Sequence, residues 1–299
     1  MKAVRPHLGR VGIWAGELDT CSAPAVREAV TAIEDLGFGT LWFPETAGRE
    51  AMAQAAILLS QSERIVVASG STDIYARDPV TAAAAQRTLE EAFPGRFLLG
   101  LWDSHPSLAE DVRGHRFGLP LPTMRAYLDA MDAAPFGPPA TAPSPHRVLA
   151  ALDPGMLALA AERAWGANPL GMPVEHTRNA RATLGPTALL AVTQLCVLGP
   201  DRAHTTEQAR ATAAAALPNR RALLRDLGFE TAENAQNAET PDDRLIDALV
   251  AHGTAEDIAR RVHEHLAAGA DHVSLHLLTD TPDAPPLRQW QDLAAHLLP

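Results

Sequence analysis

The sequence contains few of the residues that mark disulfide-bonded, metal-binding or membrane proteins. It has two cysteines in 299 residues, Cys21 and Cys196, which lie far apart and lack metal-ligand spacing. We interpret both as reduced structural thiols. No apolar run reaches the length of a membrane-spanning helix, and the N-terminal region lacks the apolar core of a signal peptide. We therefore expect a cytoplasmic protein with no membrane partner.

Local motifs of several common enzyme classes are also missing. No GxGxxG or GK[ST] segment indicates a Rossmann or P-loop nucleotide site, no HExxH or CxxC indicates a metal site, and no GxSxG elbow indicates a hydrolase. The formal net charge of -11 argues against nucleic acid as a partner, because phosphate-backbone binding needs a basic surface. A small anionic cofactor remains compatible with this charge, since it needs only local donors.

Short apolar runs alternate with helical patterns along most of the chain. The helical patterns cover residues 23–36, 50–61, 80–92, 121–134, 154–163, 173–184 and 287–298, and Ser22 and Asp78 are candidate N-caps. The expected strands are residues 11–14, 40–43, 65–69, 97–101, 147–152, 166–170, 188–198 and 272–278. Eight such units favour a (β/α)8 TIM barrel, although a doubly wound open sheet competes on pattern alone.

Two connections depart from this alternation. Residues 135–145 form a proline-rich connector, which we interpret as an ordered loop and not a domain linker. Residues 200–253, between the seventh and eighth expected strands, contain helical patterns and a polar gap over 231–240. This stretch is too long for a simple crossover and indicates a helical insertion that could form a lid or a dimer contact. We expect one domain over residues 1–299.

Polar residues follow the third and fourth expected strands. Residues 69–73 come after one strand and 103–105 after the next, and a helix opened by Pro79 joins them. In a barrel of parallel strands this is the end that carries chemistry. His105 is the best acid–base candidate because imidazole titrates near neutral pH, with a structural hydrogen-bonding role as the alternative.

Several segments, in this order along the chain, resemble a known family. They are residues 37–45, 75–79, 94–101, 104–105, 173–177 with 180–181 and 184–186, and 268–273. The combination resembles the luciferase-like flavin and deazaflavin oxidoreductases, in the actinobacterial branch that uses coenzyme F-420. The resemblance implies a TIM barrel with a helical insertion, a bound coenzyme F-420 (an 8-hydroxy-5-deazaflavin) or FMN, a small-molecule substrate and a homodimer.

The same resemblance assigns residues at the ends of the second and third strands. Glu45 lies at a polar, cofactor-facing position and is expected to be catalytic or ordering; Trp42 is cofactor-binding or core. Many relatives carry a histidine proton donor where Thr46 stands here. Relatives often have a non-prolyl cis peptide at the position of Ser69, Gly70 and Ser71, where it backs the deazaflavin ring; the alternative is an ordinary turn. Arg77, further along, lines this loop or forms a surface ion pair.

The strongest departure from the family lies after the fourth strand. Relatives have a small, glycine-containing sequence where Trp102 and Asp103 stand. Trp102 could stack on a ligand or fill the cofactor's place. We nevertheless expect Trp102, Asp103 and Ser104 to bind the cofactor, next to His105, because they follow the fourth strand.

A further set of residues is expected at the cofactor's phosphate. Backbone amides of Gly171 and Met172 precede a helix and form a candidate anion site, with Arg178 or Arg181 nearby. His176 in the first helical turn is assigned to the cofactor site, although helix capping by the segment 175–177 is the alternative reading.

Three functions are compatible with these residues. The first is hydride transfer between coenzyme F-420 and a small organic substrate. The second is an FMN-dependent luciferase-like monooxygenase. The third is a barrel that has altered or lost cofactor binding, motivated by Trp102 and Thr46, and binds a ligand without redox chemistry.

Overall fold

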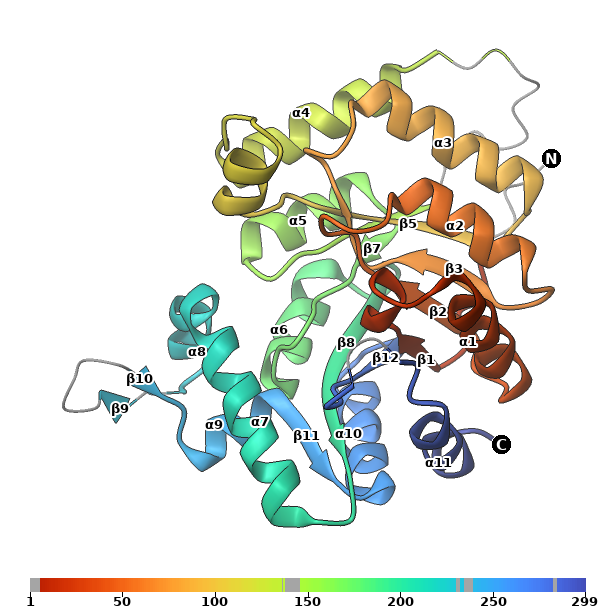
Figure 1. Ribbon diagram of the computed structural model, residues 1–299. Helices are drawn as coiled ribbons and strands as arrows, with labels where there is room; N and C mark the ends of the chain where they lie inside the picture. The colour runs from red at the N-terminus through yellow and green to blue at the C-terminus, as the bar shows by residue number, and fades with distance from the viewer. Residues whose placement is uncertain (1–5, 136, 138–145, 230–231, 234–238, 282–283) are drawn as a thin grey trace.

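The computed structural model describes residues 6–135, 137, 146–229, 232–233, 239–281 and 284–299. Within them, eight parallel strands close into a barrel surrounded by helices (Figure 1). The barrel strands are β1 (Val11–Trp14), β2 (Thr40–Phe43), β3 (Val66–Ser69), β5 (Phe97–Trp102), β6 (Arg147–Leu149), β7 (Gly166–Ala167), β8 (Leu189–Leu198) and β12 (His272–Leu277). The pairing of β7 with β8 and of β12 with β1 closes the ring. The predicted TIM barrel is confirmed, and the open sheet is excluded.

β6 and β7 each end three residues before the ends of their sequence-based ranges, whereas the other barrel strands differ from theirs by at most one residue. β6 ends at Leu149 because the chain turns there towards the cap of the next helix, although the Ala150 amide still bonds to the Leu101 carbonyl. β7 ends at Ala167, two residues before Pro169, which has no N–H to continue a ladder. An isolated bridge between Leu170 and Thr193 prolongs this contact beyond the strand.

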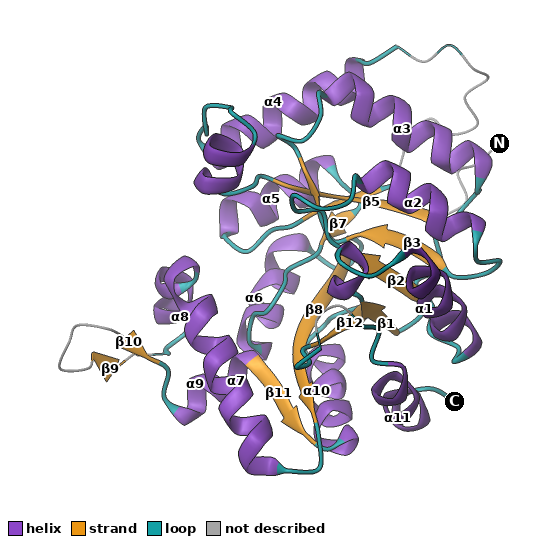
Figure 2. Cartoon of the chain, in the orientation of Figure 1, coloured by secondary structure: helices purple, strands orange, loops and turns teal. Residues whose placement is uncertain are grey.

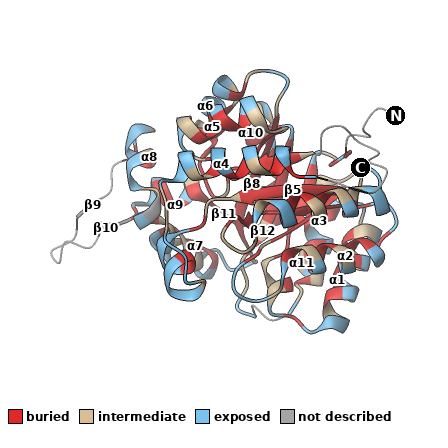
Figure 3. Ribbon diagram, turned by 90° about the horizontal axis from the view of Figure 1, so that it is seen from above, coloured by how far each residue is buried: buried red, intermediate tan, exposed pale blue. Residues whose placement is uncertain are grey.

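Helices follow the strands and cover the outside of the barrel (Figure 2). Before the long segment after β8 they are α1 (Ala23–Asp35), α2 (Ala51–Ser60), α3 (Pro79–Ala92), α4 (Pro120–Ala133), α5 (Pro154–Arg163) and α6 (Val174–Leu184). After it come α10 (Ala255–Ala267) and α11 (Leu287–Leu297). Ser22 and Asp78 accept hydrogen bonds from first-turn amides of α1 and α3, as predicted for N-caps. The barrel strands are almost entirely buried, and each covering helix buries its inner face and exposes its outer face (Figure 3).

The barrel interior is filled by side chains. Trp42 on β2 is fully buried, and its Nε1 donates a 3.0 Å hydrogen bond to Nε2 of His272 on β12. Because β1 lies between these two strands, the bond must pass through the interior of the barrel. Trp14, Ala68 and Leu98 belong to the same inner cluster. The packed interior leaves the ends of the strands as the place for a ligand.

The chain between β8 and β12 is largely helical. It contains α7 (Arg202–Ala216), the 3-10 turn η3 (Leu217–Asn219), α8 (Arg221–Asp226), the short antiparallel pair β9 (Ala232–Glu233) and β10 (Glu239–Thr240), α9 (Asp243–Leu249) and β11 (Val250–Gly253). β11 pairs with the C-terminal part of β8, from Leu195 to Leu198. Residues of α7 and α9 contribute to a second hydrophobic cluster, and both helices lie beside the barrel (Figure 1).

Parts of two predicted features lie outside the described residues. These are most of the proline-rich loop over 135–145 and of the polar gap over 231–240. No helix in the described part of the chain is long and apolar enough to span a membrane.

Candidate active site

A cavity of about 450 Å³ opens at the carboxyl ends of the barrel strands. Residues that follow β1, β2, β3, β5, β6 and β7 converge on it, and the segment around α8 adds a further wall. This is the end of a TIM barrel at which active sites form. The lining residues are Trp14, Pro44, Glu45, Thr46, Gly70, Ser71, Trp102, Asp103, Ala150, Leu152, Asp153, Met156, Asn168, Leu170, Arg220 and Leu223.

The cavity brings together part of the set expected from the sequence. The expected residues that line it are Glu45, Gly70, Ser71, Trp102 and Asp103. The expected residues that do not line it are Trp42, Ser69, Ser104, His105, Gly171, Met172 and His176.

The turn after β3 forms part of the cavity wall. The Gly70–Ser71 peptide bond is cis, as the family resemblance implied. The Nε1 atom of Trp14 donates a 2.8 Å hydrogen bond to the Gly70 carbonyl. A Cβ on Gly70 would lie 2.7 Å from that nitrogen and 3.1 Å from Cε3 of Trp42, so only glycine fits. Ser69 clamps the neighbouring strand instead of facing the cavity, since its hydroxyl bonds to both the amide and the carbonyl of Gly100.

Glu45 is held by a dense set of donors. Its Oε1 accepts the Ala51 amide at 3.1 Å and Arg77 Nη2, and its Oε2 accepts the Asp73 amide at 2.9 Å and Arg77 Nη1 at 3.0 Å. The side chains of Glu45 and Arg77 are 3% and 7% exposed, so this is a buried ion pair and not the surface pair considered for Arg77. Arg77 also pairs with Glu50 at 2.6 Å. With both oxygens engaged, Glu45 ties the loop after β2 to the loop after β3.

Ser104 and His105 turn away from the cavity. Ser104 has φ 68°, and its hydroxyl donates to Oδ2 of Asp73 at 3.1 Å. His105 is exposed, and its Nδ1 accepts the Leu108 amide at 3.1 Å and pairs with the Ser107 hydroxyl at 2.8 Å. These contacts cap the π-helical turn that follows. His105 therefore has the structural hydrogen-bonding role that was the alternative to acid–base catalysis. Its ring lies edge-on to Trp102, with the centroids 5.5 Å apart.

Asp103 keeps a carboxyl group in the cavity wall. Burial raises its pKa to about 6, and the neighbouring carboxylates Asp153 and Asp73 add to the shift. Asp73 is neutralised by Arg113 Nε at 2.9 Å. Asp153 caps α5 by accepting the Met156 amide at 3.0 Å. Trp102, next to Asp103, lines the cavity without filling it.

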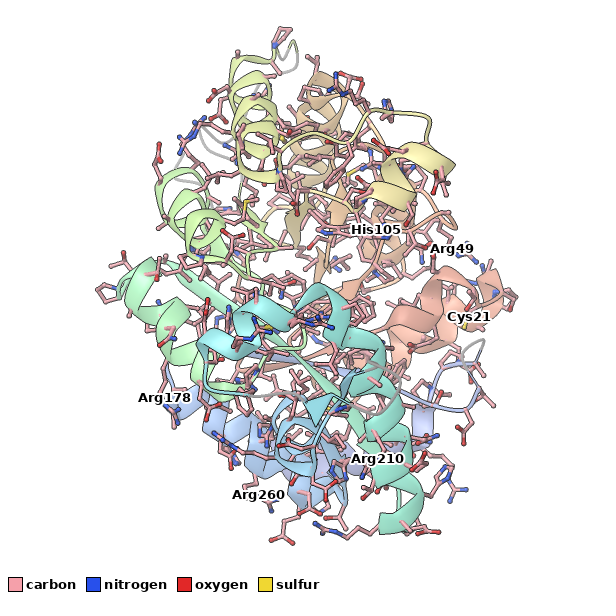
Figure 4. The ribbon with its side chains drawn as sticks, turned by 90° about the vertical axis from the view of Figure 1, so that its left-hand side faces the viewer. Cys21, Arg49, His105, Arg178, Arg210 and Arg260 are labelled. Atoms are coloured by element: carbon pink, nitrogen blue, oxygen red, sulfur yellow. The ribbon has the colours of Figure 1, made fainter. Side chains whose placement is uncertain are left out.

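The expected phosphate site needs correction. The Gly171 amide bonds to the Thr193 carbonyl at 2.8 Å, and Met172 is buried in the second hydrophobic cluster. Arg178 is exposed beside Glu175 on the outer face of α6 and points away from the body of the protein (Figure 4). Arg181 lies at the opposite end of the barrel, where it bonds to Gly269 and other groups that precede the strands.

The arginine that lines the cavity is Arg220, and not Arg178 or Arg181. Its Nη2 donates to the Leu170 carbonyl at 3.2 Å, and its Nη1 donates to the Ala216 carbonyl at 3.3 Å. Its Nε is buried without a hydrogen-bond partner, and burial lowers the pKa of the guanidinium. Among the described residues no carboxylate forms an ion pair with it. A partly buried guanidinium in a cavity wall, with no ion-pair partner among the described residues, is suited to bind an anionic ligand.

His176, the remaining expected residue, contacts the backbone of a residue that lines the cavity. His176 is 4% exposed, and its Nε2 bonds to the carbonyl of Leu152, a lining residue, at 2.7 Å. Burial lowers the pKa of His176. The histidine therefore orients the loop after β6 as a neutral donor.

Trp14, Asp153, Asn168 and Arg220 are lining residues that the sequence did not single out. Trp14 ends β1 and pairs in register with Trp42 at the end of β2, so a search of every strand end for candidate site residues would have found it. Asp153 opens a helix in the same way as Ser22 and Asp78. Arg220 has no local signal, because its position depends on how the segment after β8 folds back.

Comparisons with known proteins agree with this architecture. The sequence model of the luciferase-like monooxygenase family matches residues 10–272. A Mycobacterium tuberculosis protein named as a coenzyme F-420-dependent oxidoreductase is 33% identical over 120 residues. That match covers 40% of this chain and 33% of the relative, so it spans about a third of the relative's length.

Two solved structures illustrate the likeness of the fold. An F-420-dependent secondary alcohol dehydrogenase in complex with an F-420–acetone adduct matches with TM-score 0.76 and 14% identity, over 100% of this chain and 99% of the other. The oxygenating constituent of 3,6-diketocamphane monooxygenase from Pseudomonas putida, in complex with FMN, matches with TM-score 0.68 and 13% identity, over 96% of each chain. At these identities the structures establish the shared fold alone.

Proposed function

The chain belongs to the luciferase-like monooxygenase family, and on that premise we propose that it is an oxidoreductase that uses coenzyme F-420. The reaction is hydride transfer between the deazaflavin ring and a small organic substrate. The relative from M. tuberculosis and the similar alcohol dehydrogenase, both named for this coenzyme, favour it. A small carbonyl-bearing molecule suits a cavity lined mainly by apolar side chains.

The observation that carries the proposal is the guanidinium of Arg220, whose buried Nε has no hydrogen-bond partner and which forms no ion pair with a carboxylate of the described residues. Coenzyme F-420 and FMN both join a planar ring to a chain that carries phosphate. The cavity offers aromatic walls in Trp14 and Trp102 and a cation with an unsatisfied buried Nε in Arg220. A phosphate or carboxylate on the ligand would satisfy that donor and restore the charge balance. The residues present therefore fit a planar, anionic coenzyme.

Each cavity residue has a definable task in this function. When bound, the deazaflavin supplies or accepts the hydride. Arg220 holds the anionic chain, and the Glu45–Arg77 pair fixes the loops that carry Thr46 and Ser71. Trp102 shields one side of the cavity from water, which strengthens electrostatic interactions within it.

The first experiment is a fluorescence titration of the purified protein with oxidised coenzyme F-420, with FMN in parallel. We expect saturable F-420 binding that Arg220→Met weakens at least 10-fold. The matched control is Arg178→Met, which removes an exposed arginine outside the cavity and should leave affinity unchanged. Binding of neither coenzyme to the wild-type protein would refute the proposal.

An FMN-dependent monooxygenase is the second candidate. The description of the family and the FMN bound in the similar camphane monooxygenase favour it. Purification as a yellow protein, or tighter binding of FMN than of F-420, would establish this alternative. Arg220 would serve the FMN phosphate equally well, so the affinities decide between the two.

The third candidate, a barrel without redox chemistry, is tested at Trp102. If its ring occupies the place of a coenzyme, Trp102→Gly should increase coenzyme affinity. If the ring is a wall of a working site, the same change should reduce affinity, since an aromatic platform contributes about 1–3 kcal/mol per stacked ring. We expect the reduction. The homodimer and the cytoplasmic location stay predictions.

A further inference from the structure

We propose that Asp103 is the acid–base residue of this site. In its acid form it donates a proton to the oxygen of a carbonyl substrate while hydride is added to the adjacent carbon. This inference rests on the proposed function, because the reduced deazaflavin is the source of the hydride. It goes further by assigning the proton to one residue and the substrate to carbonyl compounds and their alcohols.

The assignment follows from comparing the ionisable groups that line the cavity, which are Glu45, Asp103, Asp153 and Arg220. Glu45 accepts four hydrogen bonds, two of them from Arg77, so both of its oxygens are already engaged. Asp153 has an oxygen committed to the start of α5. Arg220 stays protonated and cannot exchange a proton at ordinary pH. Asp103 alone, within the described residues, receives no hydrogen bond or ion pair from another residue.

The surroundings of Asp103 suit a group that carries a proton. Two carboxylates face it, Asp73 from β4 (Thr72–Asp73) and Asp153 from the start of α5, and Arg113 compensates the charge of Asp73. Burial and these neighbours disfavour the ionised form and raise the pKa to about 6. A carboxyl with a pKa near neutrality can both give and take a proton. His105, the acid–base candidate from the sequence, is exposed and does not line the cavity.

Hydride addition and protonation together convert the carbonyl group into an alcohol. The carbonyl carbon gains a hydride from the reduced deazaflavin, the C=O π bond breaks, and its electron pair takes the proton of Asp103 to form an O–H bond. The products are an alcohol, the oxidised coenzyme and the Asp103 carboxylate, which regains a proton from solvent. In the reverse direction the carboxylate accepts the alcohol proton as hydride leaves carbon.

The test uses Asp103→Asn, which keeps the shape of the side chain but cannot donate a carboxyl proton. The matched control is Asp35→Asn, an exposed aspartate on the outer helix α1. Asp103 is partly exposed and accepts no hydrogen bond from another described residue, so the Asn variant should fold; Asp103→Glu is the conservative rescue. The measurements are the affinity for oxidised F-420, the turnover of acetone, cyclohexanone and benzaldehyde with reduced F-420, and carboxyl ¹³C NMR titration of the protein without coenzyme.

We expect Asp103→Asn to bind F-420 within about threefold of wild type and to lose at least 100-fold in kcat, in the range attributed to general acid catalysis. Wild-type kcat for carbonyl reduction should fall as pH rises above about 6, and Asp103→Glu should restore part of the rate with a shifted pH profile. The proposal is overturned if the Asn variant retains its rate, if wild type reduces none of these compounds, or if Asp103 titrates below pH 4.5. If the wild-type protein does not bind F-420, the result refutes the proposed function itself.

Discussion

Trp14 and Gly70 are joined across the mouth of the barrel by a 2.8 Å hydrogen bond from the indole Nε1 to the glycine carbonyl. The bond links the end of β1 to the turn after β3, with β2 between them. Both residues line the cavity, so the same contact shapes its wall and holds two strand ends together.

The first prediction concerns Gly70→Ala. The added Cβ would lie 2.7 Å from Trp14 Nε1, and either the indole or the turn must move. We expect a loss of about 1–3 kcal/mol in the free energy of unfolding, as for other overpacked sites, together with weaker coenzyme binding. Urea denaturation measures the first effect and the F-420 titration the second. Gly137→Ala is the control, since its Cβ would meet no atom within 4 Å; equal effects at the two sites would contradict the tight contact.

The second prediction concerns the buried pair of Glu45 and Arg77. Glu45→Gln leaves the nearly buried Arg77 guanidinium with only the half-exposed Glu50 as its charge partner, and we expect a destabilisation of about 3 kcal/mol. The double variant Glu45→Gln/Arg77→Met should recover part of the loss, because the uncompensated charge is then gone. Arg125→Gln breaks an exposed pair with Glu162 and should cost less than about 1 kcal/mol. If Glu45→Gln lowers the free energy of unfolding no more than Arg125→Gln does, the Glu45–Arg77 pair does not hold the two loops together.

The third prediction concerns pH. Burial raises the pKa of Glu90 to about 7, although its carboxylate accepts from the His146 amide and Gln86. Between pH 4.5 and 7 the folded chain keeps a proton that the unfolded chain has released, so this group's contribution to stability falls as pH rises.

Glu90→Gln keeps an acceptor oxygen and removes that ionisation. Its stability should match that of wild type near pH 4.5 and exceed it by on the order of 1–2 kcal/mol at pH 8. Thermal unfolding at both pH values checks this, with the exposed neighbour Glu91→Gln as control. A stability difference that does not change with pH would show that Glu90 is not protonated in the folded chain.

The fourth prediction separates stability from binding at Arg220. Because its guanidinium is partly buried and no carboxylate of the described residues forms an ion pair with it, Arg220→Met should raise the melting temperature of the protein without coenzyme by a few degrees. The same change should weaken F-420 binding and reduce the stabilisation that added coenzyme provides. Differential scanning calorimetry with and without F-420 measures both quantities. A variant that is less stable in both conditions would assign Arg220 a purely structural role.

The bounds of two strands and the caps of two helices could be predicted from the sequence. β1 and β2 begin and end where their apolar runs do, and Ser22 and Asp78 cap the helices that they precede. These features depend on neighbours within a few positions along the chain, so local propensity and periodicity are sufficient to predict them. Gly70, Trp102 and Asp103, which line the cavity, could be predicted for the same reason, since each stands at or just after the end of an expected strand.

What the tertiary structure decided is the direction and partners of side chains that meet across the barrel. The sequence alone determined the alternation of strands and helices and the strand ends at which a site would form, and the pairing of β7 with β8 and of β12 with β1 decided that the sheet closes. It did not determine that His105 caps a turn, that both oxygens of Glu45 are taken by Arg77 and backbone amides, or that Arg220, 50 residues beyond Leu170, bonds to its carbonyl. Those outcomes depend on burial and on contacts between distant segments, which no local pattern specifies.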